Sequence, residues 1–335
     1  MARVFLTGAT GFIGGAMLER LRERGDDVVA LSRSGAPLEG AEVIKGDVLD
    51  EDVLAKGMAG CEVAYHVAGV NTLCPTDPAE LIHVNVRGAE AAVRAASRAG
   101  IGRLVLTSSA AALGEEEGTI GNEDSPHRGW YLSTYERSKH EGEVAAFAAA
   151  ARAGVDIVAV NPCSVQGPGR SGGTGRIMLA YLNGKLRAFV ETRISIVDIR
   201  DCVEGHLLAA ERGRPGERYV LCGVALTSRE ALEIISGMTG ISDRVRFLPP
   251  AVASAGAALV EGGFRVARKT PPVCREMVRT MLHGHLYDGS RATRELGLTY
   301  TPVRDTFART VDWALDRGLV QRPLPRWRVA TGAAG

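Results

Sequence analysis

The sequence has little of what marks several protein classes. Its longest strongly apolar run, residues 251–260, is about half of the ~20 residues that a membrane-spanning helix needs. Its charges balance, with 40 basic and 39 acidic side chains and a net charge of +1, so we expect no nucleic-acid partner. A glycine already stands at residue 8, which leaves no room for a signal peptide. These features predict a cytoplasmic protein without a membrane partner.

Cysteine and lysine are also scarce. The six cysteines, at positions 61, 74, 163, 202, 222 and 274, are widely separated and include no Cys-x-x-Cys pair. We therefore expect reduced thiols, with neither a disulfide framework nor a metal site. Only five of the 40 basic residues are lysines, so a lysine within a motif is more informative than an arginine.

The first half of the chain alternates β-branched runs with amphipathic stretches, as in a parallel sheet wrapped by helices. The predicted strands are Arg3–Thr7, Val28–Ser32, Glu42–Lys45, Val63–Val67, Arg103–Thr107 and Asp156–Val160. The predicted helices are Phe12–Arg24, Glu51–Met58, Pro78–Arg98 and Leu132–Arg152. This order predicts an α/β fold with a doubly wound Rossmann sheet of six parallel strands.

The second half has a less regular, helix-rich pattern. The predicted helices are Ile177–Asn183, Arg200–Arg212, Arg229–Thr239, Val252–Ala267, Ser290–Leu296 and Val303–Arg317. We expect a dinucleotide domain over residues 1–165, with a return segment near 190–212. Residues 166–320 should form a smaller, mostly helical substrate lobe over the carboxyl edge of the sheet. The Pro-rich residues 321–335 predict an extended tail.

A glycine-rich turn joins the first strand to the first helix. Glycines at such a turn permit a tight bend and close approach to a pyrophosphate, which the free N–H groups of the helix N-terminus attract. The pattern therefore predicts dinucleotide binding by Gly8, Thr10, Gly11, Phe12, Ile13 and Gly14.

The end of the second strand favours NADP(H), although NAD(H) stays possible. NAD enzymes place an acidic residue there for the ribose 2′-hydroxyl, whereas this chain reads Ser32-Arg33-Ser34. Arg33 could bind a 2′-phosphate or be one of many solvated arginines. Asp47, supported by Val48, could accept from the adenine amino group or cap the next helix. His66, Val67 and Ala68 should line the cofactor, with His66 as a hydrogen-bonded wall residue.

A tyrosine and a lysine, Tyr135 and Lys139, are four residues apart on one helix face. A nearby ammonium and an oxidised nicotinamide would favour the phenolate, so the pair suits proton transfer coupled to hydride transfer. Lys139 could also hold the nicotinamide ribose. The fifth strand ends Thr107-Ser108-Ser109, at the same sheet edge. We choose Ser109 to bind the substrate oxygen, with Ser108 as the alternative.

Together these motifs resemble the extended short-chain dehydrogenase/reductases of the NAD-dependent epimerase/dehydratase family over roughly residues 2–320. The resemblance rests on Thr-Gly-Ala-Thr-Gly-Phe-Ile-Gly at 7–14, Gly-Asp-Val at 46–48, His-Val-Asn-Val-Arg-Gly at 83–88, Tyr-x-x-x-Lys at 135–139 and Asn-Pro-Cys-Ser-Val-Gln-Gly-Pro-Gly at 161–169. It implies that Asn85 supports the active-site helix and a proton relay. It also implies that the nicotinamide is bordered by Pro162, Ser164 and Val165.

Within that family the chain resembles the dihydroflavonol 4-reductase-like branch and the hopanoid-associated sugar epimerases. Ala111-Ala112-Leu113-Gly114 stands where sugar-nucleotide epimerases commonly have Tyr-Gly, which disfavours a nucleotide sugar. We therefore expect an NADP(H)-dependent carbonyl reductase for an apolar or aromatic substrate. The expected pocket includes Val70, Asn71, Leu113, Trp130 and Gln166, which could equally be core between the lobes.

Two alternatives stay open. A sugar epimerase or dehydratase would retain NAD and consume no NADPH. A regulatory protein that binds NADP would need the glycine-rich loop but not Ser109, Tyr135 and Lys139. A homodimer is also predicted, formed through the helices at residues 78–98 and 132–152.

Overall fold

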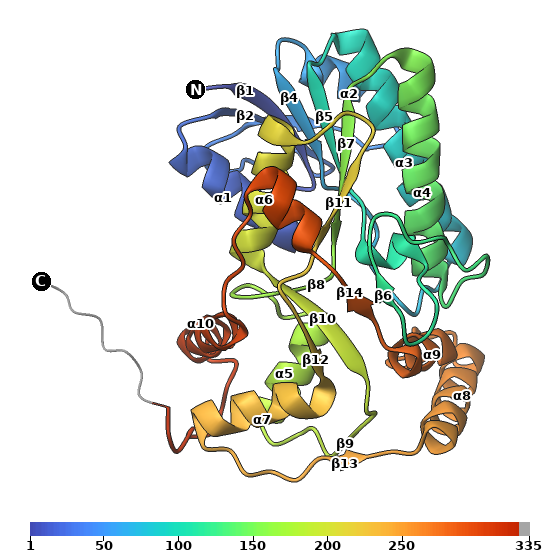
Figure 1. The fold of residues 1–335 in the computed structure, drawn as a ribbon, viewed down its shortest axis with the longest axis vertical. Coiled ribbons are helices and arrows are strands. Elements are labelled where there is room, and N and C mark those ends of the chain that lie inside the picture. Colours follow the sequence, from blue (N-terminus) through green and yellow to red (C-terminus); the bar gives the residue numbers. More distant parts are fainter. Residues whose placement is uncertain (328–335) are drawn as a thin grey trace, which may run out of the picture.

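A computed structural model describes residues 1–327, which form a larger domain and a smaller lobe (Figure 1). Among these residues, no helix combines the length and apolar character needed to cross a bilayer. The strands of the larger domain run toward the smaller lobe, which covers the carboxyl edge of the sheet (Figure 1).

The larger domain is built on a seven-stranded parallel sheet in the order β11-β7-β5-β4-β1-β2-β3. Its strands are β1 (Arg3–Thr7), β2 (Asp27–Ser32), β3 (Glu42–Lys45), β4 (Val63–His66), β5 (Arg103–Thr107), β7 (Ile157–Pro162) and β11 (Arg218–Leu221). The predicted doubly wound Rossmann fold is confirmed, but the count of six strands was wrong. β11 is only four residues long and lies in the helix-rich half, where its pattern was not recognised.

Helices cover both faces of this sheet. Leu6 packs on one face, against α1 (Phe12–Glu23), α6 (Ile199–Arg212) and the short helix η2 (Ala292–Leu296). The adjacent Phe5 points to the other face, against α2 (Glu51–Met58) and near α3 (Pro78–Ala99) and α4 (Thr134–Ala153). This alternation follows from the two-residue period of a strand buried on both faces. Figure 1 shows α3 and α4 side by side on the far side of the sheet from α1.

The smaller lobe has its own three-stranded sheet, β12-β10-β8. Its strands are β8 (Ser164–Gln166), β10 (Arg193–Asp198) and β12 (Val224–Thr227). A separate core joins β10 and β12 to α5 (Thr174–Leu182), α7 (Ser228–Thr239) and α10 (Val303–Asp316). β9 (Ala188–Phe189) pairs with β13 (Arg246–Phe247). The predicted helix at 290–296 is confirmed: residues 290 and 291 are α-helical, and η2 continues them as a π-helical turn.

A helical pair completes the lobe beside the larger domain (Figure 1). It consists of α8 (Pro250–Val266) and α9 (Arg275–His283), and α9 was not predicted. The following strand β14 (Leu286–Tyr287) pairs with β6 (Ile120–Gly121), which comes after the short helix η1 (Ala110–Leu113) of the larger domain. The chain therefore returns from the lobe to the domain at this pairing.

The first part of the predicted tail is packed against the lobe. Leu324 is buried, and Trp327 Nε1 donates to Asp312 Oδ1 at 2.9 Å. These apolar side chains complete the core of the lobe, so residues 321–327 do not extend freely. The rest of the tail prediction, residues 328–335, lies outside the described residues.

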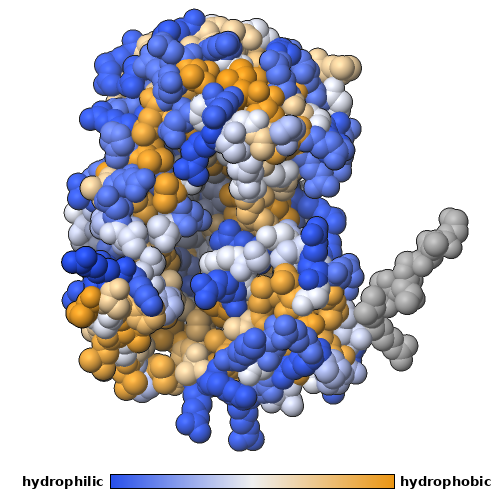
Figure 2. Space-filling model, turned by 180° about the vertical axis from the view of Figure 1, so that it is seen from behind, coloured by the Kyte–Doolittle hydropathy of each residue, from blue (hydrophilic) through white to orange (hydrophobic). Residues whose placement is uncertain are grey.

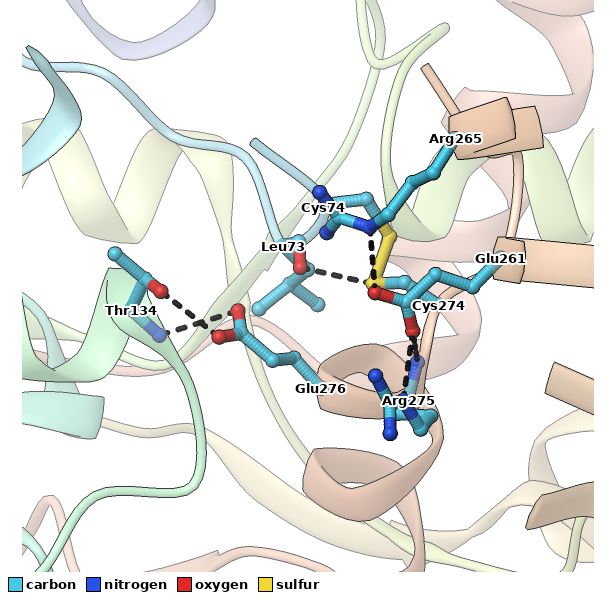
Figure 3. Close-up of a disulfide and its surroundings, with 8 residues drawn as sticks. All are labelled: Leu73, Cys74, Thr134, Glu261, Arg265, Cys274, Arg275 and Glu276. Carbon is cyan, nitrogen blue, oxygen red and sulfur yellow. Dashed lines mark hydrogen bonds and ion pairs between the residues drawn. A yellow bond between two sulfur atoms is a disulfide. The ribbon is translucent and has the colours of Figure 1, made fainter. Parts of the chain in front are cut away.

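The expectation of six reduced thiols was wrong for two of them. Cys74 and Cys274 form a disulfide between the segment after β4 and the start of α9, with Cα atoms 5.9 Å apart (Figure 3). Their separation of 200 residues explains why spacing gave no indication of the pair. Nearby, Glu276 accepts from the backbone N and the Oγ1 of Thr134, at 3.2 and 2.8 Å, so α9 also contacts the start of α4.

Candidate active site

The glycine-rich turn has the backbone geometry that a dinucleotide needs. Gly8 has a φ of +79°, and a Cβ there would lie 2.8 Å from the backbone N of Ala68. A Cβ at Gly14 would lie 2.1 Å from the Gly8 carbonyl oxygen. Gly11 precedes α1 and has no side chain to cap it, so the first amides of the helix are available to an anion.

A cavity of about 530 Å³ lies against this turn. One wall comes from the start of α1 and the other from the loop before α5; its lining residues are Thr10, Gly11, Phe12, Ala16, Glu19, Pro168, Gly169, Arg170, Ser171 and Gly172. Figure 2 shows that the surface is hollowed between the larger domain and the smaller lobe. The free helix N-terminus and the Arg170 cation in one cavity fit a cofactor pyrophosphate.

The residues predicted to choose the cofactor lie at the carboxyl ends of β2 and β3. Arg33 is exposed directly after β2, beside Ser32 and Ser34, whose hydroxyls are 3.2 Å apart. Asp47 accepts from the backbone N of Leu49 at 3.0 Å in a tight turn. The N-cap of α2 is Asp50, so the alternative of Asp47 as the helix cap was wrong. Val48 lies against Gly88 of α3.

His66 is a buried wall residue at the end of β4. Its Nδ1 lies 3.2 Å from Thr7 Oγ1, which accepts from the backbone N of Ala68 at 3.1 Å. Burial lowers the pKa of His66 to about 4, so the ring is neutral near pH 7. This network holds the segment with Val67 and Ala68 beside the glycine-rich turn.

Ser109 and Tyr135 meet although they come from different elements. Ser109 is the N-cap of η1, where its hydroxyl accepts from the backbone N of Ala111 at 3.2 Å, and it lies near enough to the Tyr135 phenol at the start of α4 to lower the pKa of that phenol. Burial raises the pKa of Tyr135, while the nearby Ser109 hydroxyl and Arg170 guanidinium act in the opposite direction. The phenol is therefore protonated near neutral pH, with a hydroxyl and a cation arranged to stabilise the phenolate.

Lys139 lies one turn further along α4. Its Nζ donates to the backbone oxygen of Thr107 at 2.8 Å, and burial lowers its pKa to about 8. Asn85 of α3 links this helix to the loop after β4. Its Nδ2 donates to Ser138 Oγ at 2.8 Å and to the Val70 carbonyl at 2.9 Å.

Ser108 and Ser109 point to different places. Ser108 Oγ is buried without a hydrogen-bond partner among residues 1–327, beside a cavity of about 10 Å³ that His66, Asn85 and Lys139 also line. This volume is close to that of a single water. The structure thus places Ser109 next to Tyr135 and Ser108 in an internal polar cavity.

The family is shown by comparison with known proteins. A family model described as "NAD dependent epimerase/dehydratase family" matches residues 4–222. The chain belongs to this epimerase/dehydratase family. As the resemblance implied, the chain is an extended short-chain dehydrogenase/reductase. It therefore binds a nicotinamide cofactor and is an NAD(P)-dependent oxidoreductase.

Three relatives match over most of their length. Sterol demethylase protein B of Methylococcus capsulatus is 34% identical over 94% of this chain and 99% of its own. A Synechocystis protein with a provisional dihydroflavonol 4-reductase name is 33% identical over 95% and 96%. A 4-hydroxy-2-methyl-3-oxo-4-farnesyl-3,4-dihydroquinoline-1-oxide ketoreductase of Stigmatella aurantiaca is 31% identical over 88% and 91%. Among solved structures, gox2253 has a TM-score of 0.81 at 30% identity, over 96% of this chain and all of its own.

An ion pair that was not predicted from the sequence supports the segment with Ser109. Arg218 Nη1 of β11 donates to Glu143 Oε1 at 3.0 Å, and Asn161 Nδ2 donates to Glu143 Oε2 at 2.6 Å. The same Asn161 amide donates to the Ser109 carbonyl at 3.0 Å. Since β11 itself was not predicted, no signal in the sequence pointed to Arg218.

Arg170 was missed as well. Its guanidinium carbon lies 5.2 Å from the centroid of the Phe12 ring, and its Nε is buried without a hydrogen-bond partner in the described chain. Its position in the Gly167–Gly175 loop, after the motif at 161–169, was the only available signal. With 35 arginines in the chain, that signal was weak.

The predicted substrate residues of this family member are not all at one surface. Leu113 is buried in a core with Ala110, Val220 and Tyr287, as the alternative interpretation expected. Trp130 is 49% exposed, with Arg128 over its ring, and Asn71 is also exposed. Of the other predicted substrate residues, Val70 donates its backbone N to Asn85 Oδ1 at 2.7 Å, and Gln166 Nε2 donates to Ser164 Oγ at 2.9 Å. The residues predicted to border the nicotinamide lie at the end of β7 and in β8; they are Pro162, Ser164 and Val165.

Proposed function

We propose that the protein is an NADP(H)-dependent reductase of medium-sized apolar or aromatic carbonyl compounds, reversible toward the alcohol. The observation that carries this proposal is that the Ser109 hydroxyl lies beside the Tyr135 phenol, whose pKa is raised by burial. A carbonyl oxygen that gains negative charge during reduction needs a hydrogen-bond donor and a proton source at one point. These two side chains supply both.

When bound, the nicotinamide supplies or accepts the hydride. Ser109 donates a hydrogen bond to the substrate oxygen, and the Tyr135 phenol delivers its proton to that oxygen. The ammonium of Lys139 stabilises the resulting phenolate and holds the cofactor ribose. Asn85 keeps α4 in place through Ser138, whose Oγ donates to the Tyr135 carbonyl at 2.7 Å.

The cofactor is proposed to be NADP(H), held at both ends of the adenosine diphosphate part. Arg33 and the Ser32 and Ser34 hydroxyls would bind the 2′-phosphate, and Asp47 the adenine amino group. Arg170 would bind the pyrophosphate from the side opposite the α1 N-terminus, since its buried Nε has no other partner among residues 1–327. An acidic residue, which would favour NAD by accepting from the 2′-hydroxyl, is missing at positions 32–34.

The relatives support an apolar carbonyl substrate. One is named for a ketone on a farnesylated quinoline oxide and another for a sterol. Both names describe mostly apolar molecules, which agrees with the apolar or neutral residues predicted for the pocket.

The test measures NADPH loss with a panel of apolar and aromatic ketones, alongside identification of the cofactor that copurifies. We expect turnover that Tyr135→Phe lowers by about 10²–10⁴-fold, with an unchanged Kd for NADPH. Tyr131→Phe would be a poorly matched control because the half-buried Tyr131 ring packs on His127 and His140. The control is therefore the surface variant His83→Gln. Retained NAD without NADPH loss would instead support an epimerase, and turnover unaffected by Tyr135→Phe would exclude the mechanism.

A further inference from the structure

Three side chains with metal-binding chemistry meet outside the candidate active site. Glu115 follows η1, His283 ends α9, and His285 precedes β14. Glu115 Oε1 lies 2.6 Å from His285 Nδ1 and 3.8 Å from His283 Nε2. One ligand atom from each residue lies within 4.8 Å of the other two. The segments are far apart in sequence, which is why the sequence analysis predicted no metal.

Two atoms of this cluster are buried without a partner. Glu115 Oε2 and His283 Nε2 have no hydrogen bond in the described chain, although the two side chains are only 2% and 4% exposed. A carboxylate oxygen or an imidazole nitrogen that is withdrawn from water without a partner is unfavourable. A cation between them would satisfy both.

The backbone holds the two histidines in position from several sides. Gly284 separates them with a φ of +67°, a conformation that turns the chain sharply at the end of α9. The backbone N of His285 donates to the Arg193 carbonyl at 3.1 Å, and its carbonyl accepts from Ser195 Oγ at 3.0 Å. The cluster is therefore anchored to β10 as well as to β14.

The charge around the cluster also suits a cation. Arg128, the basic residue that donates to the Glu115 carbonyl at 2.8 Å, is itself paired with the buried Glu136. That ion pair is neutral overall, so the Glu115 carboxylate leaves the cluster with a net negative charge. Tyr287 Oη lies 3.1 Å from His285 Nδ1 and adds a further polar atom.

We propose that Glu115, His283 and His285 bind one divalent transition-metal ion, with Zn²⁺ as the best-fitting metal. Two imidazoles and one carboxylate are an ordinary zinc ligand set, and a water would fill the fourth tetrahedral position. The ion would replace the hydrogen bond between Glu115 and His285, and His285 would bind it as a neutral imidazole with its proton on the other ring nitrogen.

The ion would join the two parts of the molecule. The start of α9 is tied to the larger domain by the Cys74–Cys274 disulfide, and its end would be tied by Glu115 and the metal. The α8–α9 pair would then be fixed at both ends of α9. This inference does not depend on the proposed reductase activity.

The test uses the full chain, stripped with EDTA, dialysed and titrated with ZnCl₂ alone. We expect one Zn²⁺ per chain and a higher Tm with Zn²⁺. His285→Gln should weaken Zn²⁺ binding at least tenfold. His283→Gln should do the same while leaving the Glu115–His285 hydrogen bond in place, which guards against a variant that fails to fold. The exposed His83→Gln is the matched control and should bind like the wild type.

Cobalt identifies the ligand atoms. Co²⁺ in place of Zn²⁺ should give the d–d bands of a site with nitrogen and oxygen ligands. A sulfur-to-cobalt charge-transfer band would assign binding to the free cysteines and overturn the proposal. Equal Zn²⁺ binding by the wild type and the His283→Gln/His285→Gln double variant, or no stoichiometric binding at all, would also overturn it.

Discussion

Lys139 Nζ donates to the backbone oxygen of Thr107 at 2.8 Å, and so connects α4 to the carboxyl end of β5. The bond therefore links the helix that bears Tyr135 and Lys139 to the strand that precedes Ser109. It also makes the protonation of this lysine consequential for both.

The rate of carbonyl reduction should therefore depend on the charge of Lys139. Burial lowers its pKa to about 8, so the side chain is an ammonium below that pH and neutral above it. We expect kcat/KM to fall as the pH rises through about 8, because the neutral amine no longer stabilises the Tyr135 phenolate. Lys139→Arg should move this fall to higher pH, and Lys139→Met should remove it and lower kcat by about 10²-fold.

A pH–rate profile of each variant checks this prediction, with the exposed Lys185→Met as the control. A profile of Lys139→Met that still falls near pH 8 would assign the titration to another group.

Arg33 should set the preference between the two cofactors. Arg33→Gln removes the proposed cation at the 2′-phosphate, and we expect the KM for NADPH to rise at least tenfold while the KM for NADH changes little. Steady-state kinetics with both cofactors measures this ratio. Arg152→Gln, at an exposed arginine near the end of α4, is the matched control. Equal effects of Arg33→Gln on NADPH and NADH would contradict a 2′-phosphate contact.

Arg170 should contribute to cofactor binding independently of turnover. A charge-assisted hydrogen bond to a phosphate is worth about 1.5–3 kcal/mol, so Arg170→Gln should raise the Kd for NADPH by about 10–100-fold. Fluorescence titration of NADPH measures this without any substrate. Arg176→Gln, which replaces an exposed arginine of the neighbouring α5, should bind like the wild type. If Arg170→Gln binds normally, the cavity holds the cofactor through the helix N-terminus alone.

The disulfide should stabilise the fold measurably. Removing a cross-link over a long loop lowers the free energy of unfolding by about 2–4 kcal/mol, so Cys74→Ser/Cys274→Ser should unfold at lower denaturant than the oxidised wild type. Under a thiol reductant the wild type should approach the variant. Denaturant unfolding with and without reductant makes the comparison, and a reductant-insensitive wild type would show that the disulfide does not form.

Local patterns were enough to predict most of the larger domain. The strands at residues 3–7, 42–45 and 103–107 have the bounds expected, because each is a short β-branched run between turn residues. The turn at Gly8 was also recognisable, because its regularly spaced glycines lie between a predicted strand and a predicted helix. β11 was not predicted, because a strand of four residues gives too short a pattern.

By itself, then, the sequence determined the Rossmann sheet, the glycine-rich turn and the Tyr135–Lys139 pair, all of which depend on residues close together in the chain. Tertiary structure alone decided that Ser109 and not Ser108 contacts Tyr135, that Cys74 meets Cys274, and that Glu115 meets His285. The physical reason is that a strand's register and a long-range contact depend on how whole elements pack. The spacing of residues along the chain gives no information about that packing.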